Sequence, residues 1–439
     1  MGIEIGLLMF PALMLVIFLG VPVAYSLFGV GLAFGLMRFG DTFVYQMVSK
    51  VDTVASYYVL AAVPLFVFMG TMLEKAGIAN QLFRAVHMWT WRLPGGLAVS
   101  TVILCVIFAA ASGVAGATEA VIGLLAIPIM MRHAYDKGLI SGTICAGGSL
   151  GTVIPPSIVV ILLGPIANVS VGDLLVGMII PGFLLSFLYM GYIVIRCAMR
   201  PQDGPATPPE GGQLPILPRL WLTLTALVPP AILIFSVLGT IILGWATPTE
   251  AAAVGALGTI LLTIGYRTFT IPILNEALIK TVRITAMVLF ILLGGTIYSG
   301  VFIALGGISA VSDLISAANL SPFATLLAFL FLAFLAGFIL DMISIMLIIV
   351  PIAIVMIRQL GYDDVWFSIL FLLVIQTSYL TPPMAPAIFY LRGISPPEIK
   401  LRDMYRGVLP FIAIQVVAII LVMAFPALAL WLPDVAFGR

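Results

Sequence analysis

The sequence predicts an all-α membrane protein that crosses the bilayer several times. Hydrophobic residues make up 62% of its 439 residues and charged residues only 8%, against roughly 25% charged residues in a soluble domain. The mean hydropathy is +1.25. Long apolar runs recur, and several approach the roughly 20 residues that a spanning helix needs. These runs cover residues 7–19, 97–110, 158–167, 220–243, 323–340 and 408–432.

The same composition excludes several classes of protein. The 19 basic and 18 acidic residues are too few to solvate a soluble protein of 46.8 kDa, which excludes a soluble enzyme and a disordered chain. A net charge of +1 gives no basis for binding nucleic acid. No basic residue precedes Arg38, so a signal peptide is not indicated and the first run is expected to remain a membrane helix.

A proline-rich segment divides the chain. Residues 201–218 contain six prolines, three glycines and no apolar run, which predicts a linker outside the membrane. It separates a first repeat, residues 1–200, from a second repeat, residues 219–439. Arg196, Arg200 and Arg219 flank the linker and favour a cytoplasmic location for it.

An internal duplication is indicated by matched polar and proline residues. Tyr135-Asp136 precedes Pro155-Pro156 by twenty residues, and Tyr362-Asp363 precedes Pro382-Pro383 by the same spacing. Chance similarity among apolar helices is the alternative, and it explains matching polar residues poorly. Duplicated halves are common in secondary transporters, whose binding sites lie where corresponding helices are broken.

Each half contains one predicted hairpin. Residues 109–118 (AAASGVAGAT) are almost all small, and the flanking pieces, 102–108 and 121–127, are too short to span a bilayer alone. We therefore expect a re-entrant helical hairpin with its tip near residues 112–116, and a second tip near 336–341. Unwound backbone at membrane depth must be buried in protein or line a cavity.

Each half also contains one helix broken at a double proline. Residues 147–152 lead into Pro155-Pro156, and residues 376–381 lead into Pro382-Pro383. Proline removes an amide donor and disfavours helix at the residue before it. The nearby hydroxyl and carbonyl oxygens suit Na⁺. A proline kink that serves only packing is the alternative.

Several acidic residues have two possible roles. Glu250 in Thr247–Glu250 is expected to cap a helix, as are Asp173 and Glu398, which follow Ser170 and Ser395 in the same arrangement. Asp341 lies inside an apolar run, and an acidic residue at such a position indicates ion coupling or stabilisation of the hairpin tip. Glu119, its partner in the first half, is either functional or a helix cap.

The remaining charged residues are expected on the surface. Asp136 and Asp363-Asp364 lie in short polar turns. A cluster of basic residues near the second double proline is expected in a solvated loop and amphipathic helix, with attraction of an anionic substrate or lipid as the alternative. The cluster consists of Arg392, Lys400, Arg402 and Arg406.

No motif indicates an enzyme. Residues 147–151 match the GxSxG string, but a nucleophile elbow needs a preceding strand. His87 and His133 lack a second metal ligand at suitable spacing, and Cys105, Cys145 and Cys197 form no CxxC pair. We expect no cofactor and no metal other than Na⁺ as a coupling ion.

The chain resembles the large membrane subunit of the tripartite ATP-independent periplasmic (TRAP) transporters. The resemblance extends over residues 5–430 or so, and its motifs are specific in combination. They are residues 63–70 (VPLFVFMG), the small-residue tip at 112–118, residues 151–157, residues 246–255 (ATPTEAAAVG) and residues 380–386 (LTPPMAP).

The resemblance implies Na⁺-driven uptake of organic acids across the bacterial inner membrane. It implies an extracytoplasmic binding protein that delivers the substrate and a small four-helix membrane subunit, here a separate polypeptide. It also implies two inverted repeats, about eleven spanning helices, and an elevator mechanism in which a mobile domain carries the substrate.

The resemblance also implies site residues. A first Na⁺ site involves Ser112, Gly116, Gly148 and Thr152, and a second involves Gly337, Asp341, Thr377, Thr381 and Met384. The substrate is expected between the tips and the unwound segments, at Ser112, Gly113, Pro155, Pro156, Ser157, Pro382 and Pro383. The first tip differs from the serine-rich tip of many members, which favours 2-oxo acids, polyols or aromatic acids over simple C4-dicarboxylates.

Two other functions remain open at this point. A stand-alone carrier driven by H⁺ or Na⁺, with Asp341 and Glu119 as proton sites, would need no binding protein. A receptor or assembly scaffold that transports nothing would use the helix breaks only for packing.

Overall fold

The computed structural model describes residues 2–113, 115–208 and 215–438, and this part of the chain forms helices and no strands. Helices of the first half are α1 (Gly2–Phe18), α2 (Val23–Phe39), α3 (Thr42–Ala55), η1 (Tyr58–Ala61), α4 (Ala62–Lys75), α5 (Ala79–Thr90), α6 (Gly96–Ser112), α7 (Ala115–Arg132), α8 (Lys137–Ser149), η2 (Leu150–Thr152), α9 (Ile158–Ala167), α10 (Val171–Gly177), α11 (Ile179–Met199) and η3 (Pro201–Asp203). Those of the second half are α12 (Ile216–Ile242), α13 (Pro248–Gly265), α14 (Ile271–Ala304), α15 (Gly307–Ala317), α16 (Pro322–Ala336), α17 (Met342–Gln359), α18 (Asp364–Leu380), α19 (Pro386–Ile394), α20 (Leu401–Ala424) and α21 (Ala427–Phe437).

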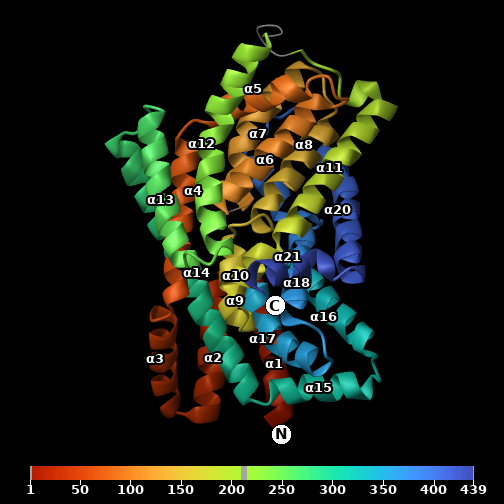
Figure 1. Ribbon diagram of the computed structural model, residues 1–439. Coiled ribbons are helices and arrows are strands. Elements are labelled where there is room, and N and C mark those ends of the chain that lie inside the picture. The colour runs from red at the N-terminus through yellow and green to blue at the C-terminus, as the bar shows by residue number, and fades with distance from the viewer. Residues whose placement is uncertain (1, 114, 209–214, 439) are drawn as a thin grey trace.

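The helices match the predicted apolar runs with one difference. Within the described residues, seven helices are long and apolar enough to cross a membrane, and shorter apolar helices lie among them (Figure 1). The run at 408–432 was predicted as one segment, but α20 ends at Ala424 and α21 begins at Ala427. The break falls at Phe425-Pro426, because proline cannot continue the helix that precedes it.

Short polar residues begin many of the helices. Thr247 and Glu250 form the predicted capping box at the start of α13, and Ser170 accepts a hydrogen bond from the amide of Asp173 at the start of α10. The prediction that Glu398 caps the start of a helix is wrong, since α20 begins only at Leu401. Ser395 ends α19 instead, and its hydroxyl donates to the carbonyl of Leu391.

The two halves run in opposite directions through the molecule. The start of α20 packs on the start of α8, where Gly407 lies against the backbone of Gly138. The end of α20 lies at the start of α18, where the indole of Trp366 donates to the carbonyl of Val422 (3.0 Å). The equivalent helices α8 and α18 therefore run antiparallel along α20, as inverted repeats require. The division at residues 200 and 219 stays a prediction.

A buried contact joins equivalent positions of the two halves. The side-chain amide of Gln376 in α18 donates to the hydroxyl of Ser149 in α8 (3.1 Å), and the two residues are 227 positions apart. This is the offset between the two double prolines. The contact therefore lies where the two halves meet.

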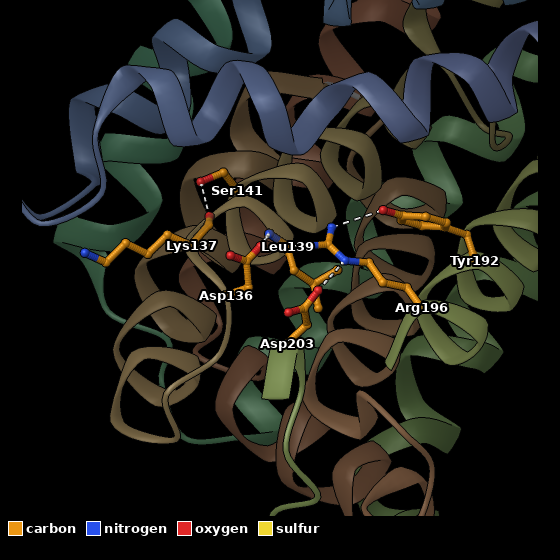
Figure 2. Close-up of polar contacts among 7 residues, drawn as sticks. All are labelled: Asp136, Lys137, Leu139, Ser141, Tyr192, Arg196 and Asp203. Atoms are coloured by element: carbon orange, nitrogen blue, oxygen red, sulfur yellow. Dashed lines mark hydrogen bonds and ion pairs between the residues drawn. The ribbon is translucent and has the colours of Figure 1, made fainter. Parts of the chain in front are cut away.

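The first part of the predicted linker is held against the helices, and residues 209–214 of it lie outside the described part of the chain. The Arg196 guanidinium at the end of α11 pairs with Asp203 and with Asp136 (both 2.9 Å) and donates to the hydroxyl of Tyr192 (Figure 2). The amide of Gly95 donates to the carbonyl of Gly204 (3.2 Å). We call this end of the molecule the linker end.

The acids predicted to be solvated lie in turns and are exposed or partly exposed, and they also make contacts that were not predicted. Asp136 caps α8, accepting from the amide of Leu139 (2.9 Å), in addition to its pair with Arg196. Asp363 caps α18 in the same way, and Asp364 pairs with Arg358 (2.5 Å). Both turns are therefore fixed in place rather than free in solvent.

Replacing Arg196 with Met is expected to loosen the linker end. The change removes two ion pairs and leaves the half-buried Asp203 without its cation, and hydrogen bonds to charged groups contribute about 1.5–3 kcal/mol each when not fully solvated. We expect faster proteolysis within residues 201–208 and a lower unfolding temperature. The exposed Arg38→Met, which has no ion pair among the described residues, is the control and should change neither.

Candidate functional site

Both hairpin tips and both broken helices meet at one cavity of about 250 Å³. The first hairpin (α6 and α7) and the second (α16 and α17) each contribute their turn, and α14 closes the side. Its lining includes Gly113, Gly116, Thr152, Gly337, Asp341 and Tyr379. The sequence predicted the first five of these as site residues.

The first tip packs tightly against the start of α9. The carbonyl of Gly113 accepts a hydrogen bond from the amide of Ile158 (3.4 Å). Gly113 has φ +62°, and a Cβ there would lie 2.7 Å from the carbonyl oxygen of Pro156, so only glycine fits without strain. Ser112 shares a hydrogen bond with Thr118 (3.0 Å). Residue 114, within the predicted tip, lies outside the described residues.

Asp341 begins the returning helix of the second hairpin. Its carboxylate accepts from the amides of Ile343 (3.1 Å) and Ser344 (3.2 Å) and from the hydroxyl of Ser344 (2.5 Å). These contacts cap α17 as expected if Asp341 stabilises the tip, and its carboxylate lies at the cavity wall. Gly337, at the other side of the turn, lies directly against the side chain of Ser378.

The hydroxyl groups around the broken helices present oxygen atoms rather than protons. Four of them donate to main-chain carbonyls at 2.7–2.8 Å, and these belong to Thr152, Thr377, Ser378 and Thr381. Ser157 donates to the carbonyl of Thr152 (2.9 Å). A hydroxyl whose proton is already bonded offers only its oxygen lone pairs, which suits a cation.

The helices that follow the double prolines begin without side-chain caps. Ser157 precedes α9 and Ala385 precedes α19, and neither side chain accepts a hydrogen bond from the first turn. The peptide bonds Pro155-Pro156 and Pro382-Pro383 are both cis. At α9 the amide of Ile158 is bonded to Gly113, which leaves the amide of Val159 as a donor beside the cavity. Helix α19 begins at Pro386, which has no N–H, so only the positive end of the helix dipole attracts an anion there.

Glu119 lies behind the cavity and is fully buried inside α7. The hydroxyl of Tyr379, a cavity residue, donates to its Oε2 atom (3.4 Å), while its Oε1 atom has no partner among the described residues. The alternative role of Glu119 as a helix cap is wrong, because α7 begins at Ala115. Gly148 of α8 lies directly against the Glu119 side chain, where a Cβ would clash.

The other predicted site residues lie around the cavity without lining it. Ser112, Gly148, Pro155, Pro156, Ser157 and Thr377 are buried behind the wall. Thr381 and Pro382 are half-buried, Pro383 is exposed, and Met384 is 47% exposed. Their roles in binding stay predictions.

Sequence reasoning missed one wall of the cavity. Ile284, Met287 and Val288 of α14 line it, as do Tyr379 and Tyr390. The tyrosines flank the second double proline, so their position near a predicted break was a usable signal. The α14 residues lie in an ordinary apolar helix and carried no signal, because only the folded chain brings α14 to the tips.

Two hairpins and two broken helices of opposite direction around a central cavity define a multi-pass membrane protein of the secondary-transporter type. Residues 10–428 match the family described as "Tripartite ATP-independent periplasmic transporter, DctM component". The chain therefore belongs to this family and is a TRAP transporter large permease of the bacterial inner membrane. This confirms the resemblance seen in the sequence.

The relatives are permeases rather than enzymes. The chain is 30% identical over 412 residues to the C4-dicarboxylate TRAP transporter large permease protein DctM of Pseudomonas aeruginosa, covering 92% of this chain and 93% of that protein. It is 29% identical to the sialic acid TRAP transporter large permease protein SiaM of Vibrio cholerae, covering 96% and 97%. It is 27% identical to the isethionate TRAP transporter permease protein DctMQ of Oleidesulfovibrio alaskensis, covering 96% of this chain and 65% of that protein.

Solved structures show the same fold. The Alcanivorax borkumensis YdaH transporter superposes with a TM-score of 0.64 over 99% of this chain and 98% of that one, at 14% sequence identity. At this identity the likeness concerns the fold alone.

Proposed function

We propose that this permease carries organic acids into the cell together with Na⁺, by an elevator movement, after delivery by an extracytoplasmic binding protein. The observation that carries the proposal is the cavity where both hairpin tips meet both broken helices. Such a site can close from either side when one hairpin or the other seals it. The relatives' names include different organic solutes, so family membership alone does not define the substrate.

Na⁺ would be held at two places near the cavity. Thr152 offers a hydroxyl oxygen beside the first tip, and Thr377 and Thr381 offer theirs near the second. Asp341 adds a carboxylate whose charge a cation would balance. Cation binding would therefore order the two tips and prepare the site for an anion.

The substrate carboxylate would lie at the uncapped starts of α9 and α19. The amide of Val159 in α9 and the positive ends of both helix dipoles favour a negative charge there. The α17 start is different, since the chain's own Asp341 already accepts its first amides. The anion is therefore expected on the side of the cavity formed by the residues after the double prolines.

A small membrane subunit would complete the permease. One relative, named DctMQ, is longer than this chain, which spans 65% of it. We propose that a small four-helix membrane subunit accompanies this chain and that lipid surrounds both. The stand-alone carrier is the alternative that the transport assay below tests.

The linker end is proposed to face the cytoplasm. The start of α12 lies at this end, next to the end of α5, where the Arg219 guanidinium donates to the carbonyl of Met88. Basic residues gather at this end, and they include Arg92, Lys137, Arg196, Arg200, Arg219, Lys400, Arg402 and Arg406. The opposite end, with α15 and the N-terminus (Figure 1), carries acidic Asp313 within α15. The turn before α18 carries Asp363 and Asp364 beside Arg358. An excess of lysine and arginine marks cytoplasmic ends.

The test is uptake of labelled organic acids into proteoliposomes that hold this chain and its small subunit, with the binding protein outside. We expect uptake with an inward Na⁺ gradient, and none when K⁺ replaces Na⁺ or when the binding protein is left out. Uptake that continues without the binding protein, or that follows a proton gradient, would contradict the proposal and favour the stand-alone carrier.

A further inference from the structure

The cavity wall is apolar on three sides. Helix α14 contributes Ile284, Met287 and Val288, helix α9 contributes Ile158 and Val159, and the second hairpin and α18 add Leu340, Met342, Ile343 and Ile375. Apolar walls bind the hydrocarbon part of a ligand by removing it from water. Most of the ligand surface in this cavity is therefore expected to be hydrocarbon.

Positive side chains are missing from the wall. In the described part of the chain no lysine, arginine or histidine lines the cavity, and Asp341 is the one charged residue that does. A first carboxylate can use the uncapped starts of α9 and α19. The Na⁺ proposed near Asp341 would balance that carboxylate, so a second substrate carboxylate would face apolar groups with no cationic side chain beside it. An unpaired buried charge is strongly disfavoured.

Substrate hydroxyl groups would also find few partners. The lining hydroxyls of Thr152 and Ser378 already donate to the main chain, and the Tyr379 hydroxyl donates to Glu119. These hydroxyls can still accept a hydrogen bond, and the Tyr390 hydroxyl also lines the cavity. A polyhydroxylated acid nevertheless has more hydroxyl groups than the wall has polar partners, so it would bury some of them without hydrogen bonds, which costs affinity. The cavity of about 250 Å³ also lies below the usual range of roughly 300–1,000 Å³ for ligand pockets.

We propose that the site selects a small acid with a single negative charge and an apolar body, such as a branched or aromatic 2-oxo acid. Dicarboxylates and polyhydroxylated acids are disfavoured because the wall has no cationic side chain and few hydrogen-bond partners. The inference rests on the proposed function, since it assigns the substrate of the same cavity. At 30% identity, the C4-dicarboxylate relative does not fix the specificity of this wall.

Binding to the membrane subunits alone tests the inference, because the binding protein has its own selectivity. The chain and its small subunit in lipid nanodiscs would be unfolded by heat with 4-methyl-2-oxopentanoate, phenylpyruvate, succinate or gluconate, each in Na⁺ and in K⁺. We expect the first two to raise the unfolding temperature in Na⁺ only. An equal or larger rise with succinate or gluconate would overturn the proposal.

A variant of the wall makes the test specific to the cavity. Met287 is 56% exposed on α14, so Met287→Arg can be accommodated and would bring a cation to the cavity. We expect the affinity ratio of succinate to 4-methyl-2-oxopentanoate to rise by about tenfold or more, whereas Met287→Leu leaves it unchanged. An unchanged ratio in Met287→Arg overturns the assignment of this wall.

A second variant covers the case in which Met287→Arg does not fold. Val159→Phe narrows the apolar part and should weaken phenylpyruvate binding more than pyruvate binding, and equal weakening contradicts the proposal. Uptake by the complete system separates the two proposals. If it takes up succinate in preference to the apolar acids, the substrate class is wrong and the proposed function stands, whereas if it takes up no organic acid, the proposed function fails.

Discussion

Replacing Asp341 with Ala is expected to abolish Na⁺-driven uptake. The carboxylate caps α17 through two amides and lines the cavity. Losing the cap costs about 0.5–2 kcal/mol of stability. Losing the charge costs more, because unit charges 4 Å apart interact by about 4 kcal/mol at an effective dielectric constant of 20. Na⁺ affinity should therefore fall by about a hundredfold or more.

Asp341→Asn separates the two effects. Asparagine caps helices about as well as aspartate, so the tip and the unfolding temperature should be kept while Na⁺-dependent uptake is lost. The Na⁺ concentration for half-maximal uptake, measured in both variants, decides between them. If Asp341→Asn transports with an unchanged Na⁺ requirement, Asp341 is a cap only and the second Na⁺ site must be placed elsewhere.

Replacing Gly407 with Ala should strongly destabilise the protein. Gly407 in α20 lies against the backbone of Gly138 in α8, and Gly142 lies against the backbone of Gly407. Small residues at such positions let two membrane helices approach closely. A Cβ at Gly407 would push against main-chain atoms, which cannot rotate away, and overpacking of this kind costs about 1–3 kcal/mol.

Gly239→Ala is the matched control. Gly239 lies inside α12, where a Cβ would meet no atom within 4 Å. Alanine there should be neutral or stabilising by about 0.5–1 kcal/mol, because it loses less backbone freedom on folding. Thermal unfolding in the same lipid compares the two variants. Equal unfolding temperatures would mean that α8 and α20 do not pack at the observed distance.

Much of the fold could be predicted because helix breaks depend on local chemistry. The small residues at 109–118 and the double prolines define where helices cannot continue, and the structure places turns at these positions. The break at Phe425 was missed, since one proline inside a long apolar run usually only bends a helix. Glu398 was misassigned because an S-x-x-E string does not distinguish a helix start from a turn that precedes one.

The site was predicted less completely for a physical reason. Residues such as Gly113, Thr152 and Asp341 carry a local signal, because glycine, a hydroxyl beside a double proline or an intramembrane acid is unusual where it stands. Tyr379 acts through a contact with Glu119, 260 positions away. Met287 is an ordinary apolar residue whose importance comes only from the surface it faces. Contacts of this kind depend on tertiary packing, which one sequence does not reveal.

The hydrogen bond between Ser149 and Gln376 bears on the origin of the chain. In a symmetric dimer of one ancestral half, a residue on the two-fold axis meets its own copy, so two serines or two glutamines would face each other. Here the Gln376 amide donates to the Ser149 hydroxyl, so two different side chains meet where a symmetric dimer would place two identical ones. Joining the halves in one gene frees each side of the axis to mutate alone. The Ser149–Gln376 contact is therefore asymmetric in a way that a dimer of two identical halves could not be.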